Sequence, residues 1–215
     1  MKSLVEAMVL DPAFDYLQPY FYSHPWALRC ELGVGEGADY MRSARRRADE
    51  IREILLPRGA DMMFFNYWLR DWSDSGPAGS DAPEDVERYL KTELHSLRFL
   101  FDCMQRYRHV SVRGLPTYAE PGDPDYDTMR RNRIVCYADG AGLDDRALIE
   151  RQLTDDGLEI SLVSFENECI LSVYDDRGCD VVFADRAHML AFYDRLRPYF
   201  LEYDLAEMER RKNQT

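Results

Sequence analysis

The stretch Tyr174-Asp175-Asp176-Arg177-Gly178-Cys179-Asp180-Val181 decides how the C-terminal half of the chain folds. An apolar run, 169–173, precedes it, and a second apolar run begins at Val181. A four-residue polar break between two apolar runs is typical of a β-hairpin. Glycine directly after a type I turn indicates a residue of positive φ. We therefore predict a turn over 175–178, with Tyr174 opposite Cys179 and Val173 opposite Asp180.

The chain before this hairpin alternates between strand and helix patterns. Trp26, Leu28, Cys30 and Leu32 share one face of a strand over 26–33, and the run 61–69 is apolar on both faces. A helix over 39–56 joins the two runs, so they are predicted to be parallel neighbours in a right-handed βαβ unit. Further helices are expected over 84–107, 186–197 and about 201–211.

Together these patterns predict one α+β domain, close to the α/β class, in which helices cover a mixed sheet of five to seven strands. The C-terminal hairpin extends this sheet in antiparallel fashion. Within residues 1–215 we expect an N-terminal arm over 1–25, a β-α-β-α half over 26–107 and a β-rich half over 108–215 that ends in two helices. A chain of 215 residues with 46% hydrophobic side chains can bury a core of this size.

Charge and cysteine content restrict the functional class. The formal net charge is −13, which disfavours nucleic acid and anionic membranes as partners and favours a basic protein. The N-terminus does not resemble a signal peptide, and no apolar run is long enough to span a bilayer. The five cysteines form no metal or disulfide spacing, so we expect buried free thiols in a cytoplasmic protein.

The hairpin aspartates are the candidates for chemistry. Asp175, Asp176 and Asp180 are the ligand type that divalent metals prefer, which leaves a small metal-dependent hydrolase as an alternative function. In the predicted pairing, however, Asp180 shares a face with Val173 and not with the turn, and Arg177 neutralises the turn carboxylates. The four histidines are scattered, and no nucleophile motif occurs. We therefore assign no catalytic residue, metal or cofactor.

The ordered set of motifs resembles a bacterial family catalogued as domain of unknown function 3885. The resemblance covers about residues 20–205, and the motifs that carry it are Leu28-Arg29-Cys30-Glu31-Leu32-Gly33, Ala44-Arg45-Arg46-Arg47-Ala48, Asn66-Tyr67, the stretch from Tyr174 to Asp180, and Leu190 with Tyr193. It implies no activity, ligand or catalytic residue. Small acidic proteins of this kind look like immunity proteins that are paired with secreted toxins.

The expected function is therefore that of a non-catalytic, immunity-like or antitoxin-like binding protein that covers the basic site of a toxin. Its candidate contact residues lie in two acidic loops and in the hairpin: Trp72, Asp74, Glu120, Asp123, Asp125, Asp175, Asp176, Arg177 and Asp180. An acidic protein docks on a cationic site with fast, salt-sensitive association. A third possibility is a module that oligomerises through the aromatic N-terminal arm.

Overall fold

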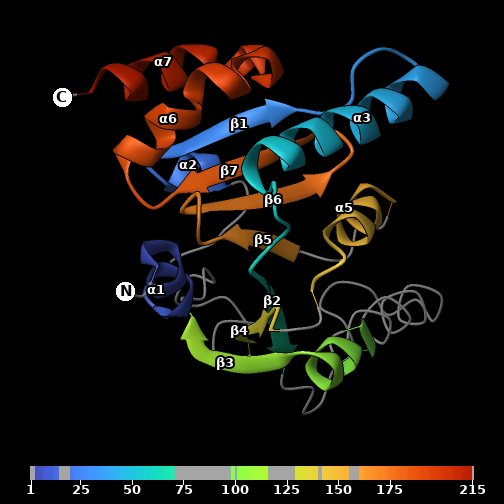
Figure 1. Cartoon of the computed structure of the whole chain (residues 1–215), viewed down its shortest axis with the longest axis vertical. Coiled ribbons are helices and arrows are strands. Elements are labelled where there is room, and N and C mark those ends of the chain that lie inside the picture. Colours follow the sequence, from blue (N-terminus) through green and yellow to red (C-terminus); the bar gives the residue numbers. More distant parts are fainter. Residues whose placement is uncertain are drawn as a thin grey trace.

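A computed structural model describes residues 3–14, 20–70, 98–99, 101–115, 129–139, 142–154 and 160–214. Its centre is a seven-stranded sheet with the strand order β1-β7-β6-β5-β2-β4-β3 (Figure 1). The strands are β1 (Ala27–Glu31), β2 (Met62–Arg70), β3 (Arg108–Leu115), β4 (Met129–Tyr137), β5 (Ile160–Ser164), β6 (Cys169–Asp175) and β7 (Gly178–Phe183). The α-helices are α1 (Leu4–Leu10), α2 (Tyr20–Ser23), α3 (Ala38–Leu55), α5 (Asp145–Thr154), α6 (Arg186–Leu196) and α7 (Leu205–Asn213). The 3-10 helices η1 (Arg197–Tyr199) and η2 (Glu202–Asp204) join α6 to α7, and residues 98–99 and 101–106 are also helical.

The topology confirms an α+β fold and corrects the predicted strand neighbours. Every pairing among the described strands is antiparallel, so the sheet is not mixed. The strand that begins at Ala27 is not beside the strand that begins at Met62, because β7, β6 and β5 lie between them. The 18-residue helix α3 is about 27 Å long, and four strand spacings amount to about 19 Å. The helix can therefore cross that distance, and its sequence pattern does not reveal how many strands it crosses.

Helices cover both faces of the sheet. α3, α5 and α6 pack on one face, and α1 and α2 pack on the other (Figure 1). β5 and β7 are buried along their whole length, as central strands covered on both sides should be. The predicted apolar stripe of α3 is buried at Ala44, Ala48, Ile51 and Leu55. Among the described residues, no helix combines the length and the apolar character that a bilayer crossing requires.

The C-terminal segment covers the outer edge of β1. Leu201 donates its backbone N–H to the carbonyl of Arg29 (3.1 Å), and Cys30 forms an isolated bridge with Phe200. The thioether of Met208 lies 3.4 Å from the backbone nitrogen of Arg29 and accepts its N–H. The free edge of β1 is therefore occupied by the chain itself, which removes a template for strand addition.

The arginines of α3 form ion pairs and hydrogen bonds within the molecule. The structure gives each of four arginines a carboxylate partner: Arg42 with Asp39, Arg45 with Glu150, Arg46 with Glu50, and Arg52 with Asp145. The guanidinium of Arg47 donates instead to the carbonyl oxygens of Glu31 and Tyr199. Arg45, Arg47 and Arg52 therefore hold α3 against its neighbours. Arg42 and Arg46 pair with carboxylates of α3 itself.

Candidate functional site

The hairpin is present, but its register differs from the prediction by one residue. Val173 pairs with Cys179 and Ser172 pairs with Asp180, and a bulge lies between Val173 and Asp175. The turn itself consists of Asp176 and Arg177. The extra residue at the bulge shifts the pairing by one position. Asp180 therefore shares a face with Ser172, and the prediction that it shares a face with Val173 was wrong.

Gly178 is required by space and not by backbone conformation. Its φ is not positive, so the predicted reason for this glycine was wrong. A Cβ atom at this position would lie 2.2 Å from the hydroxyl oxygen of Tyr174 and 2.7 Å from the carbonyl oxygen of Cys30. The phenol ring of Tyr174 therefore lies against the backbone of β7 at Gly178, where the absence of a side chain leaves room for it.

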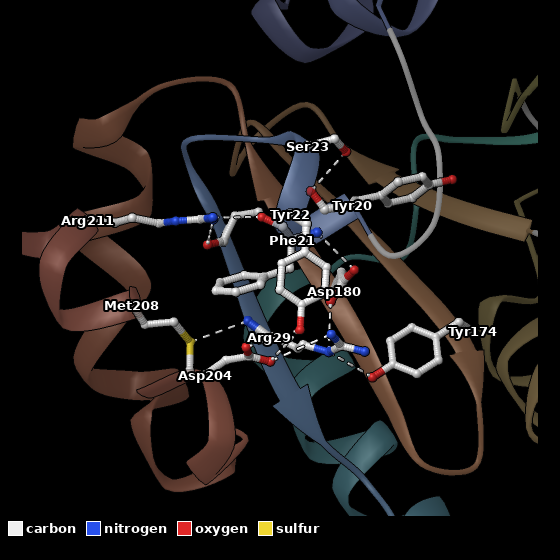
Figure 2. Close-up of polar contacts among 11 residues, drawn as sticks. Tyr20, Phe21, Tyr22, Ser23, Arg29, Tyr174, Asp180, Asp204, Met208 and Arg211 are labelled. Atoms are coloured by element: carbon white, nitrogen blue, oxygen red, sulfur yellow. Dashed lines mark hydrogen bonds and ion pairs between the residues drawn. The ribbon is translucent and has the colours of Figure 1, made fainter. Parts of the chain in front are cut away.

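Tyr174 leads to a cluster of charged and aromatic side chains around Arg29, which we call the Arg29 cluster: Tyr22, Arg29, Tyr174, Asp180 and Asp204 (Figure 2). The Nε of Arg29 donates to the hydroxyl oxygen of Tyr174 at 3.2 Å. The guanidinium carbon lies 5.2 Å from the centre of the Tyr22 ring and 5.3 Å from that of the Tyr174 ring. Two aromatic rings thus contact one cation, an arrangement that stabilises it away from bulk water.

Two carboxylates flank the same guanidinium. Asp180 lies 3.8 Å from Nε of Arg29, and Asp204 lies 3.6 Å from Nη1. Asp204 also accepts a hydrogen bond from the hydroxyl of Tyr22 at 3.2 Å. Both distances to Arg29 are longer than a normal charged hydrogen bond, so the cluster depends on electrostatic attraction and ring stacking more than on short contacts.

Asp180 is fully buried and only partly satisfied. Its Oδ2 accepts the backbone N–H of Phe21 at 3.0 Å, whereas Oδ1 has no hydrogen-bond partner within the described part of the chain. Burial raises the pKa of Asp180 from 3.8 to about 6, and the N–H of Phe21 and the charge of Arg29 oppose that rise. The carboxyl group therefore changes its charge close to neutral pH.

Asp180 begins a row of polar side chains that runs across the sheet beneath α2. Asp180 is opposite Ser172, and Ser172 is opposite Ser161 on the next strand. All three side chains are buried. The hydroxyl groups of Tyr20 and Ser161 lie 3.4 Å apart. This polar row gives the short helix α2 a specific position on an otherwise apolar sheet.

Charged side chains from later parts of the chain hold residues 3–14 and 20–24 through their backbone. Arg133 donates to the carbonyl oxygens of Val9 (2.6 Å) and Phe14 (3.2 Å). Glu168 accepts the N–H of Val5 at 2.8 Å. Arg211 donates to the carbonyl oxygens of Phe21, His24 and Ala27. These side chains fix the described residues of the predicted arm on the sheet.

We expect replacement of Arg211 by methionine to destabilise the protein by about 2 kcal/mol, because three carbonyl oxygens, two of them in buried hydrogen bonds, lose their donor. Urea denaturation measures the change, and hydrogen exchange should show faster exchange in α2. Arg210→Met is the matched control, since Arg210 is exposed and pairs with the same Glu207. The control should change stability by less than about 0.5 kcal/mol, and equal losses in both variants would contradict this role of Arg211.

The carboxylates named from the sequence do not gather into one site. Asp175 accepts hydrogen bonds from both the backbone N–H and the Nε of Arg177, each at 2.8 Å, as the predicted neutralisation requires. Asp180 lies buried under α2, and Asp176 is half-buried in the turn. Among the described residues, no group of three or more histidine, cysteine, aspartate or glutamate side chains could hold a metal. Trp72, Asp74, Glu120, Asp123 and Asp125 lie outside the described residues.

Sequence reasoning missed most of the Arg29 cluster, although the sequence contains one signal for it. Asp180 interrupts the apolar run of β7, and a charged residue in a buried strand needs a partner. Arg29 is opposite Asp180 in the sheet, but that pairing depends on the strand order. All five cysteines are buried and free, as predicted.

Comparison with known proteins adds one finding. A family model described as "Domain of unknown function (DUF3885)" matches residues 7–204, and this span includes every member of the Arg29 cluster. No curated protein and no solved structure matches. The match covers more than half of the chain and includes the hairpin from which the resemblance was inferred. The chain therefore belongs to the DUF3885 family.

Proposed function

We propose that this chain is a non-catalytic cytoplasmic binding protein of bacteria, similar to immunity or antitoxin proteins, that neutralises a toxin by covering its basic site. The observation that carries the proposal is the distribution of charge along the chain. Segments 71–97, 116–128 and 155–159 contain 14 acidic and two basic side chains, whereas the rest of the chain contains 26 acidic and 25 basic ones. Nearly all of the net charge of −13 therefore belongs to three segments.

These three acidic segments join the described strands at one end of the sheet. Arg70, the last residue of β2, is opposite Met129, the first residue of β4. Leu115, the last residue of β3, is opposite Arg131. Ile160, the first residue of β5, is opposite Phe65 near the end of β2. The negative charge is thus attached to the sheet at neighbouring strand ends.

The described part of the chain supports this proposal because α3 presents no unpaired arginines that would repel a basic partner. The arginines of that helix are paired with carboxylates or with backbone carbonyls. The hairpin turn contributes Asp176 and the Asp175–Arg177 pair at the end of β6 nearest to segment 155–159. Asp180 is not one of the proposed contact residues, because its side chain is buried and cannot reach a partner.

The chemistry of the partner follows from this charge pattern. Toxins that attack nucleic acid or nucleotides need cationic sites, and a cationic site is complementary to clustered carboxylates. Long-range attraction of this kind raises the association rate more than the final affinity, and salt screens it. The proposed contact residues are therefore the carboxylates around Asp74 and around Glu120, Asp123 and Asp125, with Trp72 as an aromatic contact.

The proposal predicts a salt-sensitive basic partner. The purified chain should capture a basic protein from its native host at low salt, and it should protect cells in which that protein is expressed. Combining Glu120→Gln, Asp123→Asn and Asp125→Asn should lower the association rate at least about tenfold at low salt. Surface plasmon resonance with the captured protein measures this rate.

A matched charge control separates local from overall electrostatics. Glu36→Gln, Asp39→Asn and Glu202→Gln remove the same charge from exposed positions of the body, so the association rate should fall less than about threefold. Equal effects of the two triple variants would contradict a local contact. Failure to capture any basic protein, together with no protection of cells, would contradict the function itself.

A further inference from the structure

A pocket of about 320 Å³ lies between α5 and the helical residues 98–99 and 101–106. Met63 of β2 lies among its lining residues, and the side chain of Leu148 comes from α5. The pocket belongs to the sheet face that α3, α5 and α6 cover, so it is separate from the Arg29 cluster. Its volume falls within the range of natural small-molecule sites, about 300–1,000 Å³.

The walls of this pocket are aromatic and planar. Phe99 and Tyr107 both line it. The guanidinium of Arg151 lies 4.3 Å from the centre of the Phe99 ring, and that of Arg106 lies 5.3 Å from the centre of the Tyr107 ring. Flat rings and flat guanidinium groups stack readily on a further flat ring. The shape and the surface chemistry therefore favour a planar guest.

The charges around the pocket balance. Its charged lining residues are Asp102, Arg106, Asp144 and Arg151, two of each sign. Asp144 precedes α5 and accepts the backbone N–H of Ala147 at 3.1 Å, so its charge stabilises the start of that helix. A charged ligand would be attracted by two of these side chains and repelled by the other two. An uncharged ligand meets no such repulsion.

We propose that this pocket binds an uncharged planar aromatic molecule of one or two rings. A dry cavity of about 150 Å³ is known to hold benzene, and this pocket has roughly twice that volume. The occupant is a free small molecule that stacks between the Phe99 and Tyr107 walls above Met63. The inference is independent of the proposed toxin neutralisation, because the pocket needs no acidic segment.

Indole and quinoline are suitable probes, since both are flat, two-ring and uncharged at neutral pH. Each should bind saturably, one per chain, with a dissociation constant on the order of 1 mM. Ligand-observed NMR measures the binding. Cys103 supplies a second readout, because its thiol lines the pocket and burial raises its pKa to about 11. Saturating indole should slow alkylation of Cys103 by iodoacetamide at least about fivefold, as mapped by mass spectrometry.

A pocket-blocking variant identifies the site. Ala147 is exposed at the pocket, so Ala147→Trp should fold normally and abolish both indole binding and the protection of Cys103. Ala187→Trp, at an exposed position of α6, is the matched control and should bind indole as the unmodified chain does. Binding that persists in Ala147→Trp would overturn the site. Absence of saturable binding by either probe up to its solubility limit would overturn the proposal.

Discussion

Replacing Gly178 by alanine should destabilise the protein by about 3 kcal/mol, measured as the free energy of unfolding in urea. The added methyl group would lie 2.2 Å from the hydroxyl oxygen and 2.8 Å from the ring of Tyr174. It would also lie 2.7 Å from the carbonyl oxygen of Cys30, which belongs to the backbone of the neighbouring strand. A flexible side chain could move away from the methyl group, but the backbone of β1 cannot do so without disturbing its pairing.

The cost of this substitution spreads from the hairpin to the Arg29 cluster. If Tyr174 moves, the Nε of Arg29 loses the acceptor that lies 3.2 Å away. The guanidinium then keeps Tyr22, Asp180 and Asp204, and neither carboxylate is within 3.5 Å of it. We therefore expect faster hydrogen exchange in β1 and α2 as well as in the hairpin.

The neighbouring turn residue provides the control for Gly178. Asp176→Ala changes the same turn, but Asp176 is only half-buried and pairs with no residue of β1. Its loss of stability should stay below about 1 kcal/mol. An unchanged free energy of unfolding for Gly178→Ala would show that the close approach of Tyr174 is not required for the fold.

The hairpin shows how far the sequence alone determines local structure. Two apolar runs around a polar break predicted both strands and the position of the turn, because those features depend only on neighbouring residues. The register and the role of Gly178 depend on Tyr174 crossing the strand and on the carbonyl of Cys30, a residue far away in the sequence. The turn pattern predicted a positive φ at Gly178. Packing against the neighbouring strand is instead the reason that no side chain fits there.

The strand order was not predictable for a related reason. Two strands separated by one helix can be neighbours or can stand at a distance, and hydrophobic periodicity is the same in both arrangements. Here β5, β6 and β7 occupy the space between β1 and β2, and short turns make them antiparallel. The fold class depends on which elements are present, so it could be predicted without the order.

The candidate site likewise has one part that was predictable from the sequence and one part that was not. Asp175 and Arg177 are two residues apart, and their contact was predictable from the sequence. Arg29, Tyr174, Asp180 and Asp204 come together only when β1, β6, β7 and the C-terminal segment are assembled. The acidic segments on which the proposed function rests are a property of composition, so they were found from the sequence directly.

Asp180 should make the stability of the protein depend on pH in the direction opposite to that of most carboxylates. Its pKa is raised from 3.8 to about 6 in the folded state. Between these values the folded chain holds a proton that the unfolded chain has released, so stability falls as the pH rises. Two units of pKa correspond to about 3 kcal/mol. Asp180→Asn removes this titration and keeps an oxygen that can accept the N–H of Phe21.

The difference in unfolding free energy between the unmodified chain and Asp180→Asn should therefore decrease by about 2 kcal/mol from pH 4 to pH 7. Arg29 and Asp204 lie close to the same group and are present in both proteins. Asp185 is the control of opposite sign. It accepts the N–H of His188 at the start of α6, which lowers its pKa, so its contribution to stability is lost as the pH falls. A difference for Asp180→Asn that is constant from pH 4 to pH 7 would mean that the buried carboxyl is as well solvated in the folded chain as in the unfolded one.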